Sequence, residues 1–253
     1  MSENIWKETF DIRSFEIDFK KRASIQVLCS FFQETAGNHV QAMGIGIESL
    51  IEQGMTWILS RFHIQIQRYP LWRERIRIET WPSDAYSFYA FRDFEVFDEQ
   101  DHKMVSASSL WLILDLKTHH PLRIPDHIVA TRVTDRERAV MDKFDSLWRP
   151  EQVTVEKRFS VRLSDLDLNQ HVNNVRYVGW AVETVPEDIW QTHQFSEIEV
   201  SFRAECVYGD VIISQSGQTE EEGQQVFIHR VIRGSDKQEL FLARTRWRED
   251  HEA

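Results

Sequence analysis

Two stretches of this sequence can be laid on each other without a gap, and their match decides how the chain folds. IQIQRYPLWRERI (residues 64–76) matches VSFRAECVYGDVI (residues 200–212). Upstream of each stretch lies a helical pattern, in which QETAG (residues 33–37) matches VETVP (residues 182–186). A repeat much longer than one solenoid unit indicates a duplicated domain.

Each half reads as one helix followed by an antiparallel meander, which is an α+β pattern. In the first half, an alternating segment of Phe15, Ile17 and Phe19 predicts a strand, and a helical stripe follows over residues 25–36. Runs rich in β-branched and aromatic residues then occupy residues 56–118, with turn-like stretches between them.

The second half repeats this order. Phe159, Val161 and Leu163 alternate and predict a strand, and a helix follows until Pro186 ends it. Four strand-like runs come after this helix. Between the halves, prolines and a dense run of charges predict a linker, with one short helix in TDRERAVMDKF (residues 134–144).

The expected domain boundaries follow from this repeat. We expect a first unit over residues 1–125, a linker over residues 126–150 and a second unit over residues 151–253. Both units need an apolar core, and 42% apolar residues in a chain of 253 are enough to build it.

The overall composition excludes several classes of protein. A net charge of −11 disfavours a general nucleic-acid binder, and the two cysteines make no disulfide framework. No apolar run approaches the roughly 20 residues of a membrane span, and the first residues do not resemble a signal peptide. We therefore expect a cytoplasmic protein.

Local basic stripes occur within this acidic chain. Arg73, Arg75 and Arg77 alternate, and so do Arg244, Arg246 and Arg248. On strands, each trio would share one face. Such a face is either a solvated sheet surface or a landing site for an acidic partner.

Only the second half carries a cluster of polar residues with chemical potential. Its members are Asp167, Asn169, His171, Glu205 and Cys206. Opposite Asn169, His171, Glu205 and Cys206, the first half has Lys20, Arg22, Tyr69 and Pro70. The polar set is thus almost absent from the first half, which is the pattern of a duplicated enzyme that kept one site.

The second half also resembles a known family. DLDLNQHVNNVRYVGW (residues 165–180) with AEC downstream resembles the acyl-acyl-carrier-protein thioesterases of plants and bacteria. In the first half, TWILSRFHIQIQRYPLWRERIRIETWP (residues 56–82) and SLWLILDLKTHHPLRIP (residues 109–125) resemble the same family. The likeness covers about residues 5–248. We expect a bacterial form, because the sequence shows no segment like the organelle transit segment of the plant members.

The resemblance implies a fold and an activity. The fold would be two tandem hotdog domains, each a long helix wrapped by an antiparallel sheet. The activity would be hydrolysis of fatty acyl thioesters of acyl carrier protein, with no metal or other cofactor. The partner would be the acyl carrier protein. Because the repeat supplies internally what single hotdogs obtain by dimerising, both a monomer and a homodimer stay open.

The resemblance also assigns roles to the polar cluster. Asp167, Asn169, His171 and Glu205 match the family's catalytic positions, and Cys206 matches a cysteine once viewed as a nucleophile. Physical chemistry favours water attack with Glu205 as base, although a covalent route through Cys206 stays possible. Strand alternation complicates this choice, because it puts Cys206 with the apolar face and Glu205 with the polar one.

Substrate-binding residues are expected in both units. Asn173 and Asn174 begin a helix whose unpaired N–H groups could polarise a thioester oxygen. For the acyl tail we expect a slot in the first unit, lined by Ile25, Leu28, Phe32, Trp57 and Phe62.

Simpler interpretations and rival functions stay open. Asp165 and Asp167 could cap turns, Asn173 or Asn174 could be only a helix N-cap, and Cys206 could be a small buried apolar residue. The rival functions are an acyl-CoA thioesterase, a hotdog dehydratase and an acyl-binding module without activity. A zinc site is disfavoured because the histidines and Cys206 lack ligand spacing.

Overall fold

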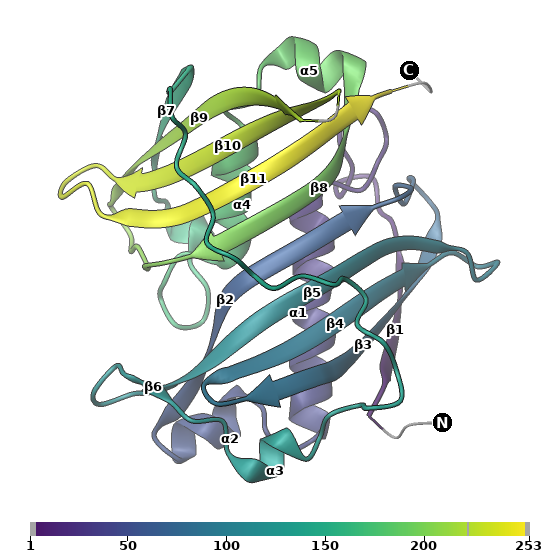
Figure 1. Cartoon of the computed structure of the whole chain (residues 1–253), viewed down its shortest axis with the longest axis vertical. Helices are drawn as coiled ribbons and strands as arrows, with labels where there is room; N and C mark the ends of the chain where they lie inside the picture. Colours follow the sequence, from purple (N-terminus) through teal and green to yellow (C-terminus); the bar gives the residue numbers. More distant parts are fainter. Residues whose placement is uncertain (1–3, 222, 251–253) are drawn as a thin grey trace. The chain divides into compact units, whose positions relative to one another are not determined.

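The computed structural model describes residues 4–221 and 223–250 and divides into two compact units (Figure 1). Unit 1 spans residues 1–144 and unit 2 spans residues 145–253. Within the described ranges, no helix is long and apolar enough to cross a membrane. The sequence suggested a linker over residues 126–150, whereas residues up to 144 cluster with unit 1. The boundaries expected from the sequence therefore stay a prediction.

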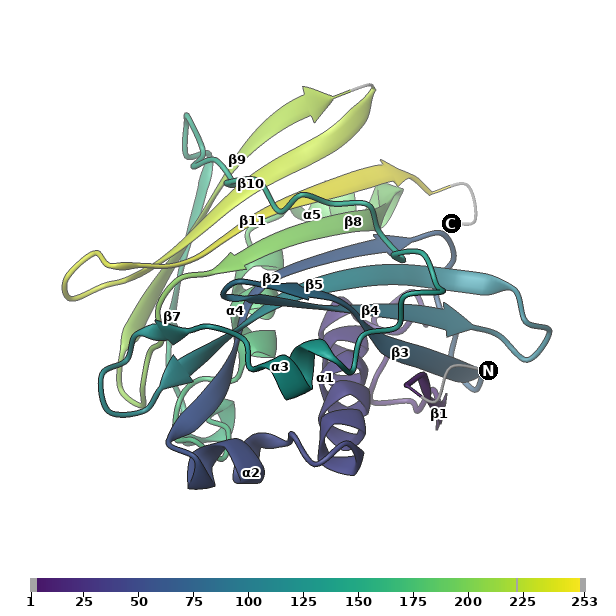
Figure 2. The same cartoon turned by 60° about the horizontal axis from the view of Figure 1, so that its bottom comes forward.

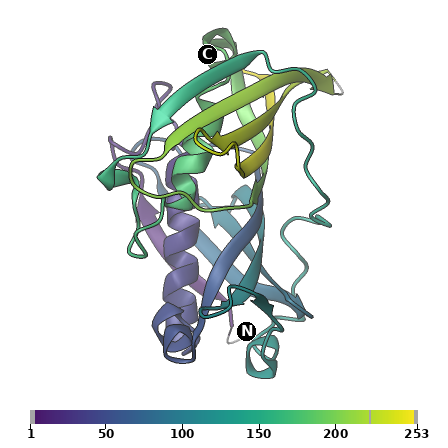
Figure 3. The ribbon, with the colours of Figure 1, turned by 90° about the vertical axis from the view of Figure 1, so that its left-hand side faces the viewer.

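Unit 1 is an antiparallel sheet with one long helix. Its elements are β1 (Trp6–Asp11), α1 (Ile25–Ala42), α2 (Ile47–Glu52), β2 (Met55–Ile66), β3 (Arg75–Tyr86), β4 (Tyr89–Phe97), β5 (Lys103–Asp115), β6 (Pro121–Leu122) and α3 (Asp126–Val129). The pairing order is β1-β3-β4-β5-β2, with the short β6 against β5. Figures 1 and 3 show α1 lying along one face of this sheet.

Unit 2 repeats the plan with its own strands. Its elements are β7 (Val155–Ser160), the 3-10 turn η1 (Leu163–Asp165), α4 (Asn174–Val182), α5 (Glu187–Thr192), β8 (His193–Phe202), β9 (Val211–Glu221), β10 (Gln224–Arg233) and β11 (Glu239–Glu249). The pairing order β7-β9-β10-β11-β8 is that of unit 1, strand for strand. The duplication and the α+β class expected from the sequence are confirmed, and Figure 2 shows α4 against the unit 2 sheet.

The two long helices begin in the same way. The Ser24 hydroxyl caps α1 by accepting from the Val27 N–H, and the Asn173 side chain caps α4 by accepting from the Val175 N–H. Both caps satisfy a backbone donor that a helix start leaves without a partner. Ser24 and Asn173 are also opposite each other in the sequence repeat, so the two helices begin at equivalent residues.

Three local expectations were wrong. Phe15 and Phe19 do not lie on a strand; they lie in turns, with 75% and 68% of their surface exposed. Leu163 is likewise exposed in η1. Residues 134–144 form no helix, and the short helix of this region is α3 instead. Alternation of apolar residues predicts a strand only where neighbouring backbone is free to pair with it.

The segment after α3 packs against unit 1 through specific hydrogen bonds. The Val133 N–H donates to the Pro82 carbonyl, and the Ala139 N–H donates to the Asp93 carboxylate at 2.8 Å. Asp93 is buried and also accepts from the Ser108 hydroxyl. Burial raises the pKa of Asp93, so these donors are needed to hold its charge.

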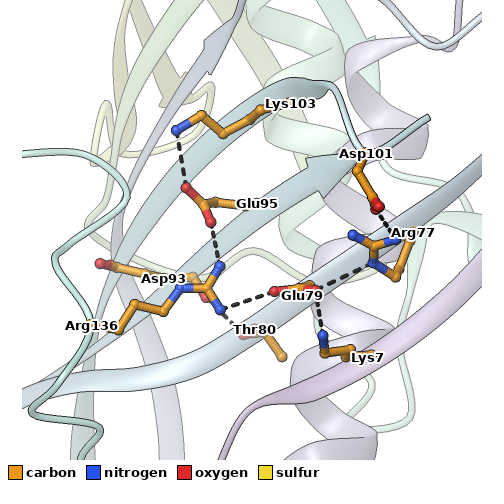
Figure 4. A network of polar contacts seen from close by, with 9 residues as sticks. All are labelled: Lys7, Arg77, Glu79, Thr80, Asp93, Glu95, Asp101, Lys103 and Arg136. Atoms are coloured by element: carbon orange, nitrogen blue, oxygen red, sulfur yellow. Dashed lines mark hydrogen bonds and ion pairs between the residues drawn. The ribbon is translucent and has the colours of Figure 1, made fainter. Parts of the chain in front are cut away.

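The first arginine trio does not share one strand face, because Arg73 lies in the turn before β3, and Arg77 belongs to a charge network (Figure 4). Arg77 pairs with Glu79 and with Asp101, and Arg136 joins the same Glu79 to Glu95. In unit 2, Arg244 and Arg246 also pair with glutamates. The paired carboxylates favour the solvated-face interpretation for these arginines.

A buried histidine makes unit 2 sensitive to acid. His229 lies between the hydroxyls of Thr184 and Thr245, at 3.2 and 2.9 Å, and burial lowers its pKa to about 3. The unfolded chain has the ordinary pKa of about 6.5, so it takes up the proton first as pH falls. The histidine therefore destabilises the fold progressively from about pH 6.5 down to about pH 3.

This sensitivity can be measured by urea unfolding between pH 7 and pH 4. We expect the His229 contribution to the free energy of unfolding to fall by about 1.4 kcal/mol per pH unit well below pH 6. His229→Gln should show a shallower dependence than the wild type, whereas His127→Gln, at an exposed position, should not. Equal slopes in all three proteins would contradict the assignment.

Candidate active site

The polar cluster is carried by a tight loop between η1 and α4. The Asp167 N–H donates to the His171 carbonyl at 2.8 Å, and Gln170 takes a positive φ of 62° to close the turn. Unit 1 has the same turn, with an Asp18 N–H to Arg22 carbonyl bond of 2.8 Å. The loop is thus a property of the fold, and its side chains alone distinguish the two units.

Asp165 anchors the base of this loop. It is buried and accepts from the Arg162 N–H and guanidinium, while its carbonyl accepts from the Asn173 N–H at 2.9 Å. Burial favours the neutral carboxyl, but the Arg162 bonds outweigh it and hold the pKa of Asp165 below its usual range. Asp165 is therefore a structural cap of the turn.

A second loop brings Glu205 to His171. Strand β8 ends at Phe202, so Glu205 and Cys206 lie beyond the strand, and strand alternation does not govern where they point. The Val172 N–H donates to the Cys206 carbonyl at 3.0 Å and joins the two loops. As a result, His171 Nδ1 lies 3.3 Å from Glu205 Oε2, with both side chains partly open to solvent.

Asp167 and Asn169 lie at the exposed tip of the loop. The Asp167 carboxylate accepts from the Asn169 N–H at 2.8 Å, which fixes the backbone from which the Asn169 amide projects. Asp167 therefore caps this turn, which is the simpler of the interpretations left open for it, and unit 1 has the same bond between the Lys20 N–H and Asp18. The side chains of Asp167 and Asn169 both remain accessible to a substrate.

Asn173 and Asn174 lie at the start of α4, below the loop tip. The Asn173 side chain accepts from the Val175 N–H at 2.9 Å, so one donor of the helix N-terminus is already occupied. The N-cap interpretation of Asn173 is thus observed. Contact of either asparagine with a substrate stays a prediction.

Cys206 is buried next to the exposed His171–Glu205 pair, whereas a nucleophile must be accessible to its substrate. It has 1% of its surface exposed, its Sγ lies 3.0 Å from the Tyr177 hydroxyl, and burial raises the pKa of its thiol to about 11. Sequence reasoning missed Tyr177, which it read only as part of the helix. The repeat places Tyr177 opposite Leu28, and this gain of a hydroxyl in unit 2 is the feature of the sequence that points to Tyr177.

Unit 1 contains an apolar cavity of about 430 Å³, within the range of small-ligand sites. Its lining includes Ala36, Val40, Met43, Trp57, Ala90 and Trp111. Of the five residues expected to line an acyl slot, Trp57 lies in this lining. Ile25, Leu28, Phe32 and Phe62 are buried in the core instead, where Phe32 packs against the rings of Phe62 and Phe94.

The burial of Cys206 leads to a direct test. At pH 8 its thiol should be almost entirely protonated, and iodoacetamide should not alkylate it in the folded protein. Cys206→Ala should keep at least about half of the turnover that the wild type shows with a thioester substrate. Mass spectrometry before and after alkylation, with a urea-unfolded sample as the positive control, measures the first expectation. Rapid labelling together with loss of turnover in the alanine variant would restore the covalent route.

Comparison with known proteins places both units. Residues 3–132 match the model of the acyl-ACP thioesterase N-terminal domain, and residues 149–249 match that of the acyl-ACP thioesterase C-terminal domain. An acyl-[acyl-carrier-protein] hydrolase of the chloroplast from Cuphea viscosissima is 27% identical over 96% of the chain. The chain spans about 62% of the length of that relative.

Two solved structures share the whole fold. The acyl-ACP thioesterase from Bacteroides thetaiotaomicron superposes with a TM-score of 0.88 at 24% identity, over 96% of this chain and 98% of that one. The 12:0-ACP thioesterase from Umbellularia californica gives a TM-score of 0.86 at 27% identity, over 97% of this chain and 94% of that one. The tandem hotdog fold is thereby confirmed.

Proposed function

Because this chain belongs to the acyl-ACP thioesterase family, we propose that it hydrolyses fatty acyl thioesters of acyl carrier protein and releases the free fatty acid. The observation that supports this most is the His171–Glu205 pair, 3.3 Å apart beside an exposed asparagine. A carboxylate and an imidazole at this separation can pass a proton between water and a leaving group. A cytoplasmic location stays a prediction.

The proposed reaction uses water rather than a covalent intermediate. The Glu205 carboxylate takes a proton from water, and the water oxygen bonds to the thioester carbonyl carbon. The resulting oxyanion collapses, the carbon–sulfur bond breaks, and the thiolate of the carrier takes up the proton. The products are a fatty acid and the free carrier thiol. His171 orients Glu205 and shares its proton, and the Asn169 amide donates to the thioester oxygen.

The acyl tail is assigned to the cavity of unit 1. A cavity surface that is mostly apolar, although Asp84, Arg92 and Arg132 also border it, suits an aliphatic chain, since each buried CH₂ contributes about 0.8 kcal/mol of transfer free energy. The pocket residues then differ in part from those expected from the sequence. Ala36 and Val40 on α1, with Met43 at the C-cap of this helix, line the cavity in place of Ile25, Leu28 and Phe32.

Substitution of the paired residues tests the reaction. We expect Glu205→Gln and His171→Ala to lower kcat by about 10²-fold or more, because each removes a proton-transfer group. The assay is free thiol release from a panel of acyl-carrier-protein thioesters. Glu187→Gln, an exposed carboxylate on α5, serves as the matched control and should keep wild-type turnover.

The same assay separates the rivals. A higher kcat/KM for the acyl carrier protein than for CoA carrying the same acyl group supports the proposal, and the reverse would favour an acyl-CoA thioesterase. An absorbance change from enoyl-thioester formation would favour a dehydratase. Acyl binding with no thiol release from any chain length would leave only a binding module.

Filling the cavity tests the assignment of the tail. Ala36→Phe should lower kcat/KM for the longer acyl chains by about tenfold, while shorter chains lose less, because the added ring occupies space that the distal methylenes need. Ala42→Phe puts the same ring on an exposed position of α1 and should not shift the preference. A uniform loss over all chain lengths in Ala36→Phe would place the tail elsewhere.

A further inference from the structure

The Tyr177 hydroxyl holds the backbone next to Glu205. Tyr177 lies on the first turn of α4 and is buried, with its ring against those of Trp180, Phe202 and Phe241. Its oxygen accepts from the Cys206 N–H at 3.0 Å, in addition to its contact with the Cys206 sulfur. The ring is therefore fixed by packing, and the hydroxyl points at the loop.

The other end of the same peptide group is held as well. The Cys206 N–H and the Glu205 carbonyl belong to one planar peptide unit. That carbonyl accepts from the Arg233 guanidinium at 2.6 Å, and Arg233 is itself tied to Asp210 and Asp236. Hydrogen bonds at both ends restrain rotation of this peptide plane. They therefore limit rotation about the Cα–C bond of Glu205, and with it the directions that the Glu205 side chain can take.

Comparison of the two units shows whether the Tyr177 hydroxyl is needed for the fold or only for the site. At the positions of Tyr177 and Cys206, unit 1 has Leu28 and Pro70. Leucine has no hydroxyl and proline has no N–H, so both halves of this hydrogen bond are missing together. The loop-to-loop bond survives there, with the Ala23 N–H donating to the Pro70 carbonyl at 2.8 Å. The loop pair therefore forms without the tyrosine.

We propose that Tyr177 is a positioning residue that holds the Glu205 carboxylate beside His171 through the Glu205–Cys206 peptide. This inference rests on the proposed function, in which Glu205 activates water. The hydroxyl occurs in the unit that carries the catalytic candidates and is absent from the unit that lacks them. Its effect on the reaction is exerted through backbone geometry, without contact with the substrate.

Tyr177→Phe removes the hydroxyl and keeps the ring. We expect kcat for thiol release to fall about 10- to 100-fold, with KM changed less than about twofold, because a misplaced reacting group costs orders of magnitude in rate. The pH profile of kcat should also change its shape. A loss of folded protein would lower the amplitude alone. Tyr86→Phe, at an exposed tyrosine of unit 1, is the matched control and should match the wild type.

A double variant distinguishes positioning from the satisfaction of a buried donor. Tyr177→Phe leaves the Cys206 N–H without a partner, which by itself destabilises the fold. Adding Cys206→Pro removes that N–H, as Pro70 does in unit 1. The double variant should recover part of the lost unfolding temperature while kcat stays low. If it recovers kcat as well, the hydroxyl only satisfied a donor and the proposal is wrong.

Wild-type turnover keeps this test separate from that of the function. Absence of thiol release by the wild type would overturn the proposed function. Release by the wild type with an equal kcat and pH profile in Tyr177→Phe would overturn the positioning role alone. The Cys206→Ala variant keeps the backbone N–H, so it should retain kcat where Tyr177→Phe does not.

Discussion

One backbone hydrogen bond brings the two loops of the site together: the Val172 N–H donates to the Cys206 carbonyl at 3.0 Å. It joins a loop that precedes α4 to a loop that follows β8, two segments far apart in sequence. Because the bond uses main-chain atoms, it sets no requirement on the side chains at either end. His171 and Glu205, the immediate neighbours of these two residues, meet as a consequence. The same bond occurs in unit 1 between Ala23 and Pro70, so the two loops are joined even where the polar side chains of the site are missing.

The two units illustrate how one frame can carry different side chains. Unit 1 places Lys20, Arg22 and Tyr69 where unit 2 places Asn169, His171 and Glu205. A cationic arginine cannot exchange protons near neutral pH, whereas an imidazole can. Unit 1, which lacks the histidine and the glutamate, contains the apolar cavity. Duplication thus allows one copy to keep reactive groups exposed while the other encloses apolar space.

The sequence predicted the elements better than it predicted their surroundings. Helical periodicity and the repeat were enough for the α+β class, and the polar spacing identified the candidate residues. Alternation failed at Phe15 and Phe19, where the backbone turns instead of pairing. For Glu205 and Cys206 it gave the observed environments, an exposed glutamate and a buried cysteine, although both residues lie beyond the end of β8. Phe32 and Ala36 are both buried on α1, yet one packs in the core and the other lines a cavity; burial patterns do not distinguish these.

The cysteine beside Glu205 shows why reactivity cannot be inferred from residue type. A thiol with a histidine nearby suggests a nucleophile, but Cys206 is buried against the Tyr177 hydroxyl, and burial raises the pKa of its thiol to about 11. Its backbone, however, takes part in both bonds that shape the site, through its N–H and its carbonyl. A larger side chain would push against Tyr177, and a charged one could not be buried there without a partner. The small, neutral thiol can therefore be buried directly beside the exposed carboxylate of Glu205, the residue to which we assign the role of base.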